Sequence, residues 1–145
     1  MVAPTRPQID GILGRLAANG GRRTAARQAI VEAVFASGSH LTADEIARRV
    51  QKRFPSVNIS TVYRTLESLE KLGVIDHVHL GHGRAIYHRS DDAHQHLVCE
   101  RCERVEELPA SKLRNFLGML EREFGFEVDR GHFAIVGLCK ACRTR

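Results

Sequence analysis

The chain has 145 residues, of which 43% are hydrophobic, and a formal net charge of +5, so it can form one domain or two small ones around a hydrophobic core. It has no run of 18 apolar residues, which excludes a transmembrane helix, and its first residues lack the apolar stretch of a secretory signal. We therefore expect a cytoplasmic protein without membrane association. Residues 1–75 hold 11 Lys and Arg against 6 Asp and Glu, whereas residues 76–145 hold 11 of each. This asymmetry predicts that the first half binds a polyanion such as DNA, although a solvated basic surface would give the same charge.

The first half is predicted to be helical. Apolar residues at helical spacing over residues 9–16 predict one helix, and Thr24 is expected to cap a second that runs to Gly38. The sequence TADE at residues 42–45 is a capping box for a third helix. A fourth is expected over residues 58–72, with Asn58 as its N-cap.

The fourth helix is followed by a predicted β-hairpin, with strands over residues 74–80 and 85–88 around a glycine-rich turn. Helices followed by a hairpin are typical of a winged helix-turn-helix, in which the opening turns of the recognition helix enter the major groove of DNA. Candidate base or phosphate contacts are therefore the outward residues of those turns, and cations before and within the second helix are candidates for phosphate or the minor groove. These candidates are Ser60, Thr61, Tyr63, Arg64, Arg22, Arg23 and Arg27. The alternative is that they are ordinary surface residues.

The second half is predicted to alternate strands with one helix. A polar segment at residues 89–92 suggests a hinge, and two strands are expected over residues 96–100 and 104–108. An amphipathic helix is expected over residues 112–124, and closing strands at Val128 and residues 133–138. The whole pattern predicts an α+β fold.

All four cysteines fall into two CxxC pairs, Cys99 with Cys102 and Cys139 with Cys142. Two such pairs form a closed tetrahedral four-sulfur site that suits structural zinc. A redox-active dithiol is the alternative, but a single metal explains two pairs better.

Seven of the eight histidines lie in the second half. His94 and His96 are two residues apart on a predicted strand, so both imidazoles face one side. They cannot join a four-sulfur site that is already complete. The sequence therefore predicts a second metal site of different chemistry.

Three motifs resemble the Fur family of metal-dependent repressors when taken together. They are STVYRTL at residues 60–66, HxHxxCxxC at residues 94–102 and VEE at residues 105–107, and the resemblance extends from about Arg22 to Cys142. Within the family, HVHLGHG at residues 77–83 and HFAI at residues 132–135 most resemble the nickel-uptake regulator branch. The resemblance implies a homodimer, with an N-terminal winged helix-turn-helix domain over residues 1–89, a hinge over residues 90–93 and a small C-terminal α/β dimerisation domain over residues 94–145.

The resemblance also implies two histidine-rich metal sites. By the family pattern, a regulatory site near the domain junction is formed by His40, His88, His94, His96 and Glu107, with Asp92 as an alternative ligand. By the pattern of the nickel branch, a second site is formed by His77, His79 and His132. Each single histidine could instead be an ordinary surface or buried imidazole.

Nitrogen-rich sites suit nickel, zinc and copper better than iron(II) or manganese, and the resemblance favours nickel over zinc or iron. We therefore expect a repressor that binds palindromic operator DNA as a homodimer when nickel is bound, and controls metal-uptake genes. A zinc-responsive repressor of the same family is the main alternative, and peroxide sensing by an iron-loaded member fits an imidazole-rich site poorly. A zinc-dependent enzyme is not expected, because the sequence has neither HExxH nor the deaminase motifs. A zinc-ribbon interaction module is the third class considered.

Overall fold

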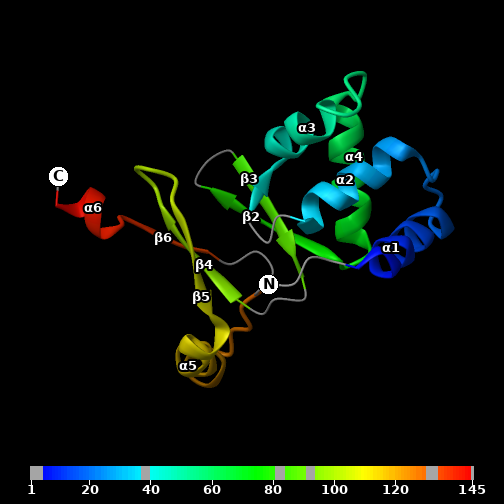
Figure 1. Cartoon of the computed structure of the whole chain (residues 1–145). Helices are drawn as coiled ribbons and strands as arrows, with labels where there is room; N and C mark the ends of the chain where they lie inside the picture. Colours follow the sequence, from blue (N-terminus) through cyan, green and yellow to red (C-terminus); the bar gives the residue numbers. More distant parts are fainter. Residues whose placement is uncertain (1–4, 37–39, 81–83, 91–93, 130–133, 145) are drawn as a thin grey trace. The chain divides into compact units, whose positions relative to one another are not determined.

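The structure is a computed structural model that describes residues 5–36, 40–80, 84–90, 94–129 and 134–144. The chain divides into two compact units. The first comprises Met1–Asp76 and Ala85–Asp91, and the second His77–Arg84 and Asp92–Arg145. Figure 1 labels the helices and strands along the chain.

Four helices form most of the first unit: α1 (Arg6–Ala18), α2 (Ala25–Ala36), α3 (Ala43–Gln51) and α4 (Ile59–Lys71). Helices α2, α3 and α4 begin directly after the predicted caps, whereas α1 begins three residues before the predicted stripe over residues 9–16. The Thr24 hydroxyl accepts from Arg27 N at 3.1 Å, and the Asn58 side chain accepts from Ser60 N at 3.0 Å. These bonds satisfy amide groups that have no partner inside the helix.

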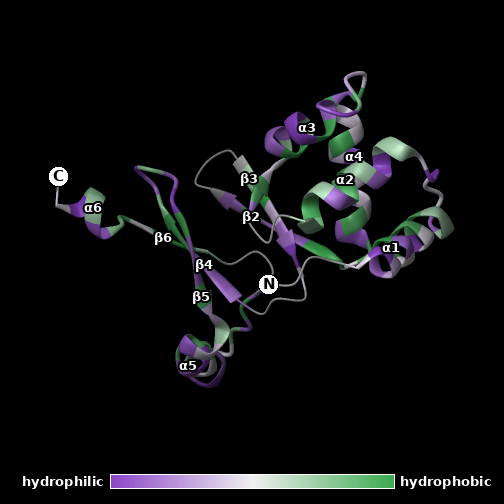
Figure 2. Ribbon diagram, viewed as in Figure 1, coloured by the Kyte–Doolittle hydropathy of each residue, from purple (hydrophilic) through white to green (hydrophobic). Residues whose placement is uncertain are grey.

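The capping box of α3 is formed on both sides. The Thr42 hydroxyl accepts from Glu45 N at 3.2 Å, and the Glu45 carboxylate accepts from Thr42 N at 2.8 Å. This backbone donor is the main reason why the pKa of Glu45 lies below its usual value. Figure 2 shows α3 with hydrophilic residues on one side and hydrophobic residues on the other, as its sequence pattern requires.

A three-stranded sheet follows the helices. It has the order β1-β3-β2, with β1 at Leu41–Thr42, β2 at Ile75–Leu80 and β3 at Arg84–Arg89. The strands β2 and β3 confirm the two arms of the predicted hairpin, whereas β1 was not predicted because two residues are too few for a sequence pattern. Strand β1 pairs antiparallel with β3, so that Leu41 faces Tyr87.

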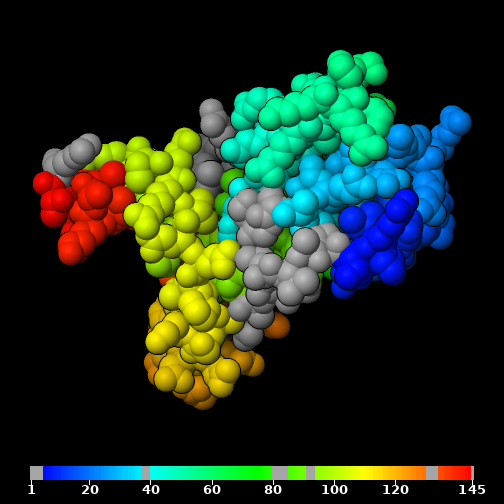
Figure 3. All heavy atoms as spheres, in the orientation of Figure 1, coloured from blue at the N-terminus to red at the C-terminus, as the bar shows by residue number. Residues whose placement is uncertain are grey.

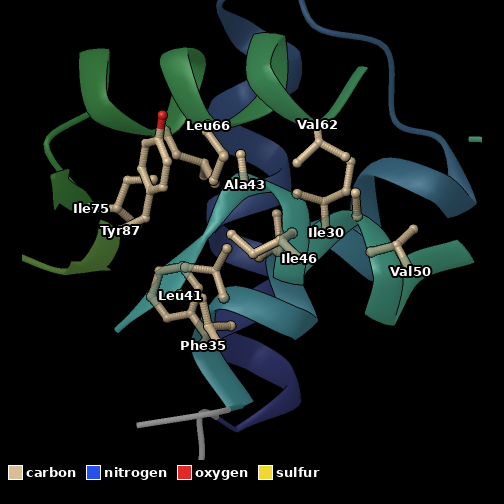
Figure 4. Packing of buried hydrophobic residues seen from close by; sticks show 14 of the residues in the cluster. Ile30, Phe35, Leu41, Ala43, Ile46, Val50, Val62, Leu66, Ile75 and Tyr87 are labelled. Atoms are coloured by element: carbon tan, nitrogen blue, oxygen red, sulfur yellow. The ribbon is translucent and has the colours of Figure 1, made fainter. Parts of the chain in front are cut away.

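The first unit has a continuous hydrophobic core. Ile30, Ile46, Val62 and Leu66 are fully buried, and each comes from α2, α3 or α4. Figure 4 shows Ile75 and Tyr87 beside Leu66, so the hairpin strands contribute to the same core as the helices. Helix α1 packs on α2, and Figure 3 shows the two helices in close contact.

The second unit contains a three-stranded sheet of order β5-β4-β6. Its strands are β4 (His94–Cys99), β5 (Val105–Pro109) and β6 (Ala134–Gly137). Strand β4 is central, antiparallel to β5 and parallel to β6. Strand β4 begins at His94, two residues before the strand that was predicted over residues 96–100. His94 and His96 therefore lie on the same strand.

Helical segments complete the second unit: the 3-10 helix η1 (Ala110–Lys112), α5 (Arg114–Phe124) and α6 (Lys140–Arg143). Helix α5 ends at Gly125, whose φ of 62° places it in the left-handed region and lets its N–H bond to Glu121 O at 3.0 Å. Helix α6, a single turn, was not predicted.

One strand prediction is wrong, because Val128 lies in a stretch, residues 125–129, that has no regular structure. The β-preference of a single valine is too weak to define a strand. Gly38, the hairpin turn at residues 81–83, Asp92 and Phe133 lie outside the described residues, as does most of the proposed hinge at residues 90–93. Among the described residues, no helix is both long and apolar enough to cross a membrane.

Candidate metal centres and nucleic-acid interface

The four cysteines converge in the second unit. Each offers a sulfur, and the four sulfur atoms lie within 4.8 Å of one another, with 3.8 Å between Cys102 Sγ and Cys139 Sγ. A tetrahedral zinc with Zn–S bonds of about 2.3 Å requires sulfur atoms about 3.8 Å apart. All four thiols are free rather than bridged by disulfides, so the cluster fits the predicted four-sulfur zinc site.

The backbone around the first CxxC pair is arranged as a tight knuckle. Glu103 adopts a left-handed φ of 57°, and Cys99 O accepts from Glu103 N at 2.9 Å. The Cys99 sulfur accepts from the backbone N–H of Cys139 at 3.3 Å. This bond, with others from Cys102 and Arg101, lowers the pKa of the Cys99 thiol to about 6. Donors that stabilise a thiolate favour metal ligation at neutral pH.

The fourth cysteine has the opposite tendency in the metal-free cluster. Hydrogen bonding to Cys139, followed by burial, raises the pKa of Cys142 to about 12. Four thiolates this close repel one another, so they cannot all ionise without a cation among them. The cluster therefore needs a divalent ion for all four sulfurs to carry charge.

His94 and His96 form a pair on one side of β4. Their Nε2 atoms are 3.1 Å apart, and His96 is only 3% exposed. Two imidazoles bound to one metal at about 2.0–2.1 Å have nitrogen atoms roughly 2.9–3.4 Å apart, depending on the bond angle. The pair therefore fits two adjacent positions of one ion.

Glu107 lies on the neighbouring strand β5, directly opposite His96 in the antiparallel register. Directly opposed residues of an antiparallel pair project to the same face of the sheet. The second unit thus brings together three of the five predicted regulatory ligands.

The other two predicted regulatory ligands meet within the first unit. The ring centroids of His40 and His88 are 5.3 Å apart. Their proximity follows from the β1–β3 register, because Leu41 pairs with Tyr87 and the residues next to them are therefore neighbours. His88 Nδ1 is 3.1 Å from Arg89 O, a backbone contact of the kind that orients a metal-binding imidazole.

His77 and His79 form a third pair on β2, with 3.3 Å between their Nε2 atoms. This separation also fits two ligands of one ion. The third member predicted for this site, His132, lies outside the described residues.

The opening turns of α4 expose the predicted DNA-contacting side chains. Ser60, Thr61, Tyr63 and Arg64 are exposed, whereas Val62, Leu66 and Leu69 are buried. Thr65 is also buried and donates its hydroxyl to Thr61 O at 2.8 Å. Sequence reasoning missed this residue, because a threonine in a helix stripe is not distinguished from a surface threonine by periodicity alone.

The predicted cations near α2 have different surroundings. Arg22 and Arg23 are exposed, and Arg23 forms an ion pair with Asp10 of α1. Arg27 is partly buried and donates to Arg22 O at 3.1 Å. Arg23 and Arg27 therefore also hold the α1–α2 connection, a structural role that the sequence did not indicate.

Four exposed cations at the end of α3 were not predicted as candidates. They are Arg48, Arg49, Lys52 and Arg53. Arg53 lies 3.8 Å from Glu32 and over the Phe54 ring. The clustering of these cations within six residues of the basic half was the available signal. They extend the positive surface of the helical unit.

The profile of the Ferric uptake regulator family matches residues 18–135. The chain belongs to the Fur family. Its curated relatives include the peroxide-responsive repressor PerR of Staphylococcus saprophyticus, which is 29% identical over 138 residues, 95% of this chain and 93% of PerR.

Solved Fur structures share the fold. The ferric uptake regulator of Helicobacter pylori superposes with a TM-score of 0.80 at 23% identity, over 99% of this chain and 97% of that one. The Fur of Francisella tularensis, solved with iron, gives a TM-score of 0.72 at 25% identity, over 86% and 96% of the two chains. The predicted α+β fold is therefore confirmed, with an N-terminal winged helix-turn-helix domain and a C-terminal dimerisation domain.

Membership of the Fur family establishes a metal-responsive transcription regulator and excludes the zinc-dependent enzyme and the zinc-ribbon scaffold. Fur regulators are DNA-binding homodimers. The matched relatives are PerR and Fur proteins, so these similarities do not assign the chain to the nickel branch of the family.

Proposed function

We propose that this Fur-family protein is a nickel-dependent repressor of metal-uptake genes, which acts in the cytoplasm as a homodimer on palindromic operator DNA. The observation that carries the proposal is the set of three histidine pairs, His40/His88, His94/His96 and His77/His79. A donor set dominated by imidazole suits nickel, zinc or copper better than iron(II) or manganese.

The regulatory ion is proposed to be held by ligands from both units. His40 and His88 form one half of its ligand set, and His94, His96 and Glu107 form the other. Each half is already paired within its own unit, so little side-chain freedom is lost when a metal binds. A shared ion would link the DNA-binding unit to the dimerisation unit and favour one spacing of the two recognition helices. A related protein gives a parallel, since the Fur of H. pylori has three functional metal binding sites.

The coupling free energy between metal binding and operator binding has an expected range. Allosteric coupling of ~1–3 kcal/mol changes operator affinity by roughly 5–150-fold, and bound operator must tighten metal binding by the same factor. The two recognition helices of a dimer must reach half-sites about one helical turn apart. The four-cysteine site is proposed to hold zinc permanently and to stabilise the second unit rather than to respond to supply.

The ligand assignment is tested by His96→Gln and His40→Gln, which remove one ligand from each unit. Both should reduce the metal-stimulated increase in operator affinity from at least about fivefold to less than twofold. The measurement is fluorescence anisotropy on a palindromic AT-rich duplex with and without Ni(II). His79→Gln serves as the comparison, because it changes the same residue type in the His77/His79 pair, which is not proposed to hold the regulatory ion. Full stimulation in His40→Gln would show that the regulatory ion does not link the units.

The DNA surface is tested by Arg64→Ala, with Lys71→Ala as a control that removes the same charge from the last turn of α4. Arg64 lies in the turns proposed to enter the groove, whereas Lys71 is paired with Glu67 at 2.8 Å. Arg64→Ala should weaken binding by ~1–3 kcal/mol, about 5–150-fold. Lys71→Ala should change it less than threefold. Equal losses in the two variants in a gel-shift titration would mean that α4 contributes only general charge.

Two alternatives differ in the metal. A zinc-responsive repressor predicts that Zn(II) stimulates operator binding at a lower free concentration than Ni(II), with the four-cysteine site already filled. Peroxide sensing is favoured by one observation, the 29% identity to PerR. It predicts that hydrogen peroxide releases the Fe(II)-loaded protein from DNA within minutes, whereas the nickel-loaded protein stays bound.

A further inference from the structure

The first unit contains an open cavity that takes no part in the metal sites or in the proposed DNA surface. Its volume is about 460 Å³, within the range of sites for small organic ligands. One wall is a single face of α1, formed by Gln8, Gly11, Ile12 and Arg15 at helical spacing. The remaining wall comes from Phe35 at the end of α2, Gly73 and Val74 after α4, and Arg89 and Ser90 at the end of β3.

The floor of the cavity is apolar, and its polar groups are cationic. Ile12, Phe35 and Val74 supply hydrocarbon surface, and Arg15 and Arg89 supply two guanidinium groups. Among the described residues that line the cavity there is no Asp or Glu. A ligand with a negative charge and an apolar body matches two guanidinium groups beside hydrocarbon surface.

Both guanidinium groups are held in place by the fold. Arg15 donates to Leu72 O at 2.7 Å, at the end of α4, and Arg89 stacks over the Phe35 ring with its central carbon 5.5 Å from the ring centroid. An arginine fixed by one contact loses less side-chain entropy when it binds a ligand through its other N–H donors.

Gly11 leaves room on the helical wall. A Cβ placed at Gly11 would meet no atom within 4 Å, although glycine in a helix costs about 0.5–1 kcal/mol relative to alanine. The stability of α1 would increase with a larger residue here, and a larger residue would project into the cavity.

We propose that this cavity binds a small organic anion, a carboxylate carried on an aromatic or aliphatic body. The carboxylate lies between Arg15 and Arg89, and the apolar body lies on Ile12, Phe35 and Val74. Because Arg15 also donates to Leu72 O, it connects the cavity to the end of α4, the helix to which the proposed function assigns DNA reading. Binding itself does not depend on that function.

The test uses the full-length protein and 1-naphthoate as the probe, with the uncharged 1-naphthamide as its isostere. Calorimetric titration should give a saturable Kd on the order of 0.1–1 mM for naphthoate, typical of a ligand of this size. Naphthamide should bind at least about fivefold more weakly, because it cannot form a charge-assisted bond with arginine. Equal affinity for the two probes would overturn the proposal.

Two matched variants locate the site. Gly11→Leu fills the cavity and should abolish saturable binding. Gly14→Leu adds the same side chain to the same helix at another position with no atom within 4 Å of a Cβ, and it should bind like the wild type. Unchanged binding by Gly11→Leu, or equal losses in both variants, would refute the cavity as the site. Amide NMR shifts on wild-type protein provide a check without mutation, since naphthoate should perturb Gly11, Gly73 and Ser90 and leave Gly118 and Gly137 unchanged. Shifts confined to other residues would also overturn the proposal.

Discussion

The two units of the chain bury apolar surface to very different extents. In the first, a continuous cluster includes six fully buried residues from α2, α3 and α4, namely Ile30, Val31, Ile46, Val62, Leu66 and Leu69. In the described part of the second, the buried apolar residues are Val78, Val98, Cys99 and Leu117, and two polar residues, Gln95 and His96, are buried with them. Six large apolar side chains of the second unit stay exposed: Phe116, Phe124, Phe126, Ile135, Val136 and Leu138.

This difference indicates two routes to stability. The first unit has enough buried hydrocarbon to fold by the hydrophobic effect. The second is too small and too open for that route, and small domains of this kind commonly need a metal or a partner chain. The four-cysteine cluster has the geometry to bind a metal, and the exposed apolar surface is suited to a second copy, as Fur homodimers require.

The largest expected effect is loss of zinc from the second unit. Cys99→Ser should remove one sulfur ligand, and structural zinc supplies ~10–16 kcal/mol of apparent binding free energy in small domains. We expect almost all of the zinc to be lost, with less than about 0.2 zinc atoms per chain remaining. Amide hydrogen exchange should become rapid in the second unit alone. Ala141→Ser, between the two cysteines of the second pair, is the control. Full zinc content and wild-type exchange in Cys99→Ser would show that the second unit does not depend on the metal.

The core of the first unit should behave in the opposite way. Leu66 is fully buried on α4, and Leu66→Ala should lower the free energy of unfolding by about 2–5 kcal/mol through lost burial and a cavity. The loss should be the same with and without a chelator, since the four-cysteine site lies in the second unit and Leu66 packs in the hydrophobic core of the first. Thermal unfolding followed by circular dichroism measures it. A chelator-dependent loss would mean that the two units do not fold by separate routes.

The smallest of the three effects concerns the dimer. Val136 is 50% exposed on β6, a strand paired only with β4 in the described sheet. Val136→Asp should weaken dimerisation by ~1–3 kcal/mol, because it places a charge on the exposed apolar surface that we expect a second copy to cover. Sedimentation at several concentrations measures the dissociation constant. Lys112→Asp, which also adds a negative charge to the second unit, should leave it unchanged. An unchanged constant in Val136→Asp would move the interface elsewhere.

Helix starts and the winged-helix order could be predicted from the sequence, because caps act within four residues. Asn58 and the Thr42–Glu45 box bond as their spacing required. The four-cysteine site could be predicted for a similar reason, since each CxxC pair is a local turn. Elements without a local signal were missed: β1 depends on pairing with β3, and α6 is a single turn that begins directly after Cys139 and includes Cys142.

By itself the sequence determined which residues could bind metal and where α2, α3 and α4 began, since both depend on residue type and short-range spacing. The tertiary structure decided which of those residues meet. The β1–β3 register brings His40 to His88, and the β4–β5 register sets Glu107 opposite His96. Strand registers are set by side chains that pack across the fold, so pairs 11 or 48 residues apart cannot be assigned from spacing along the chain. The cavity beside α1 has the same origin, because its walls come from four segments that only packing brings together.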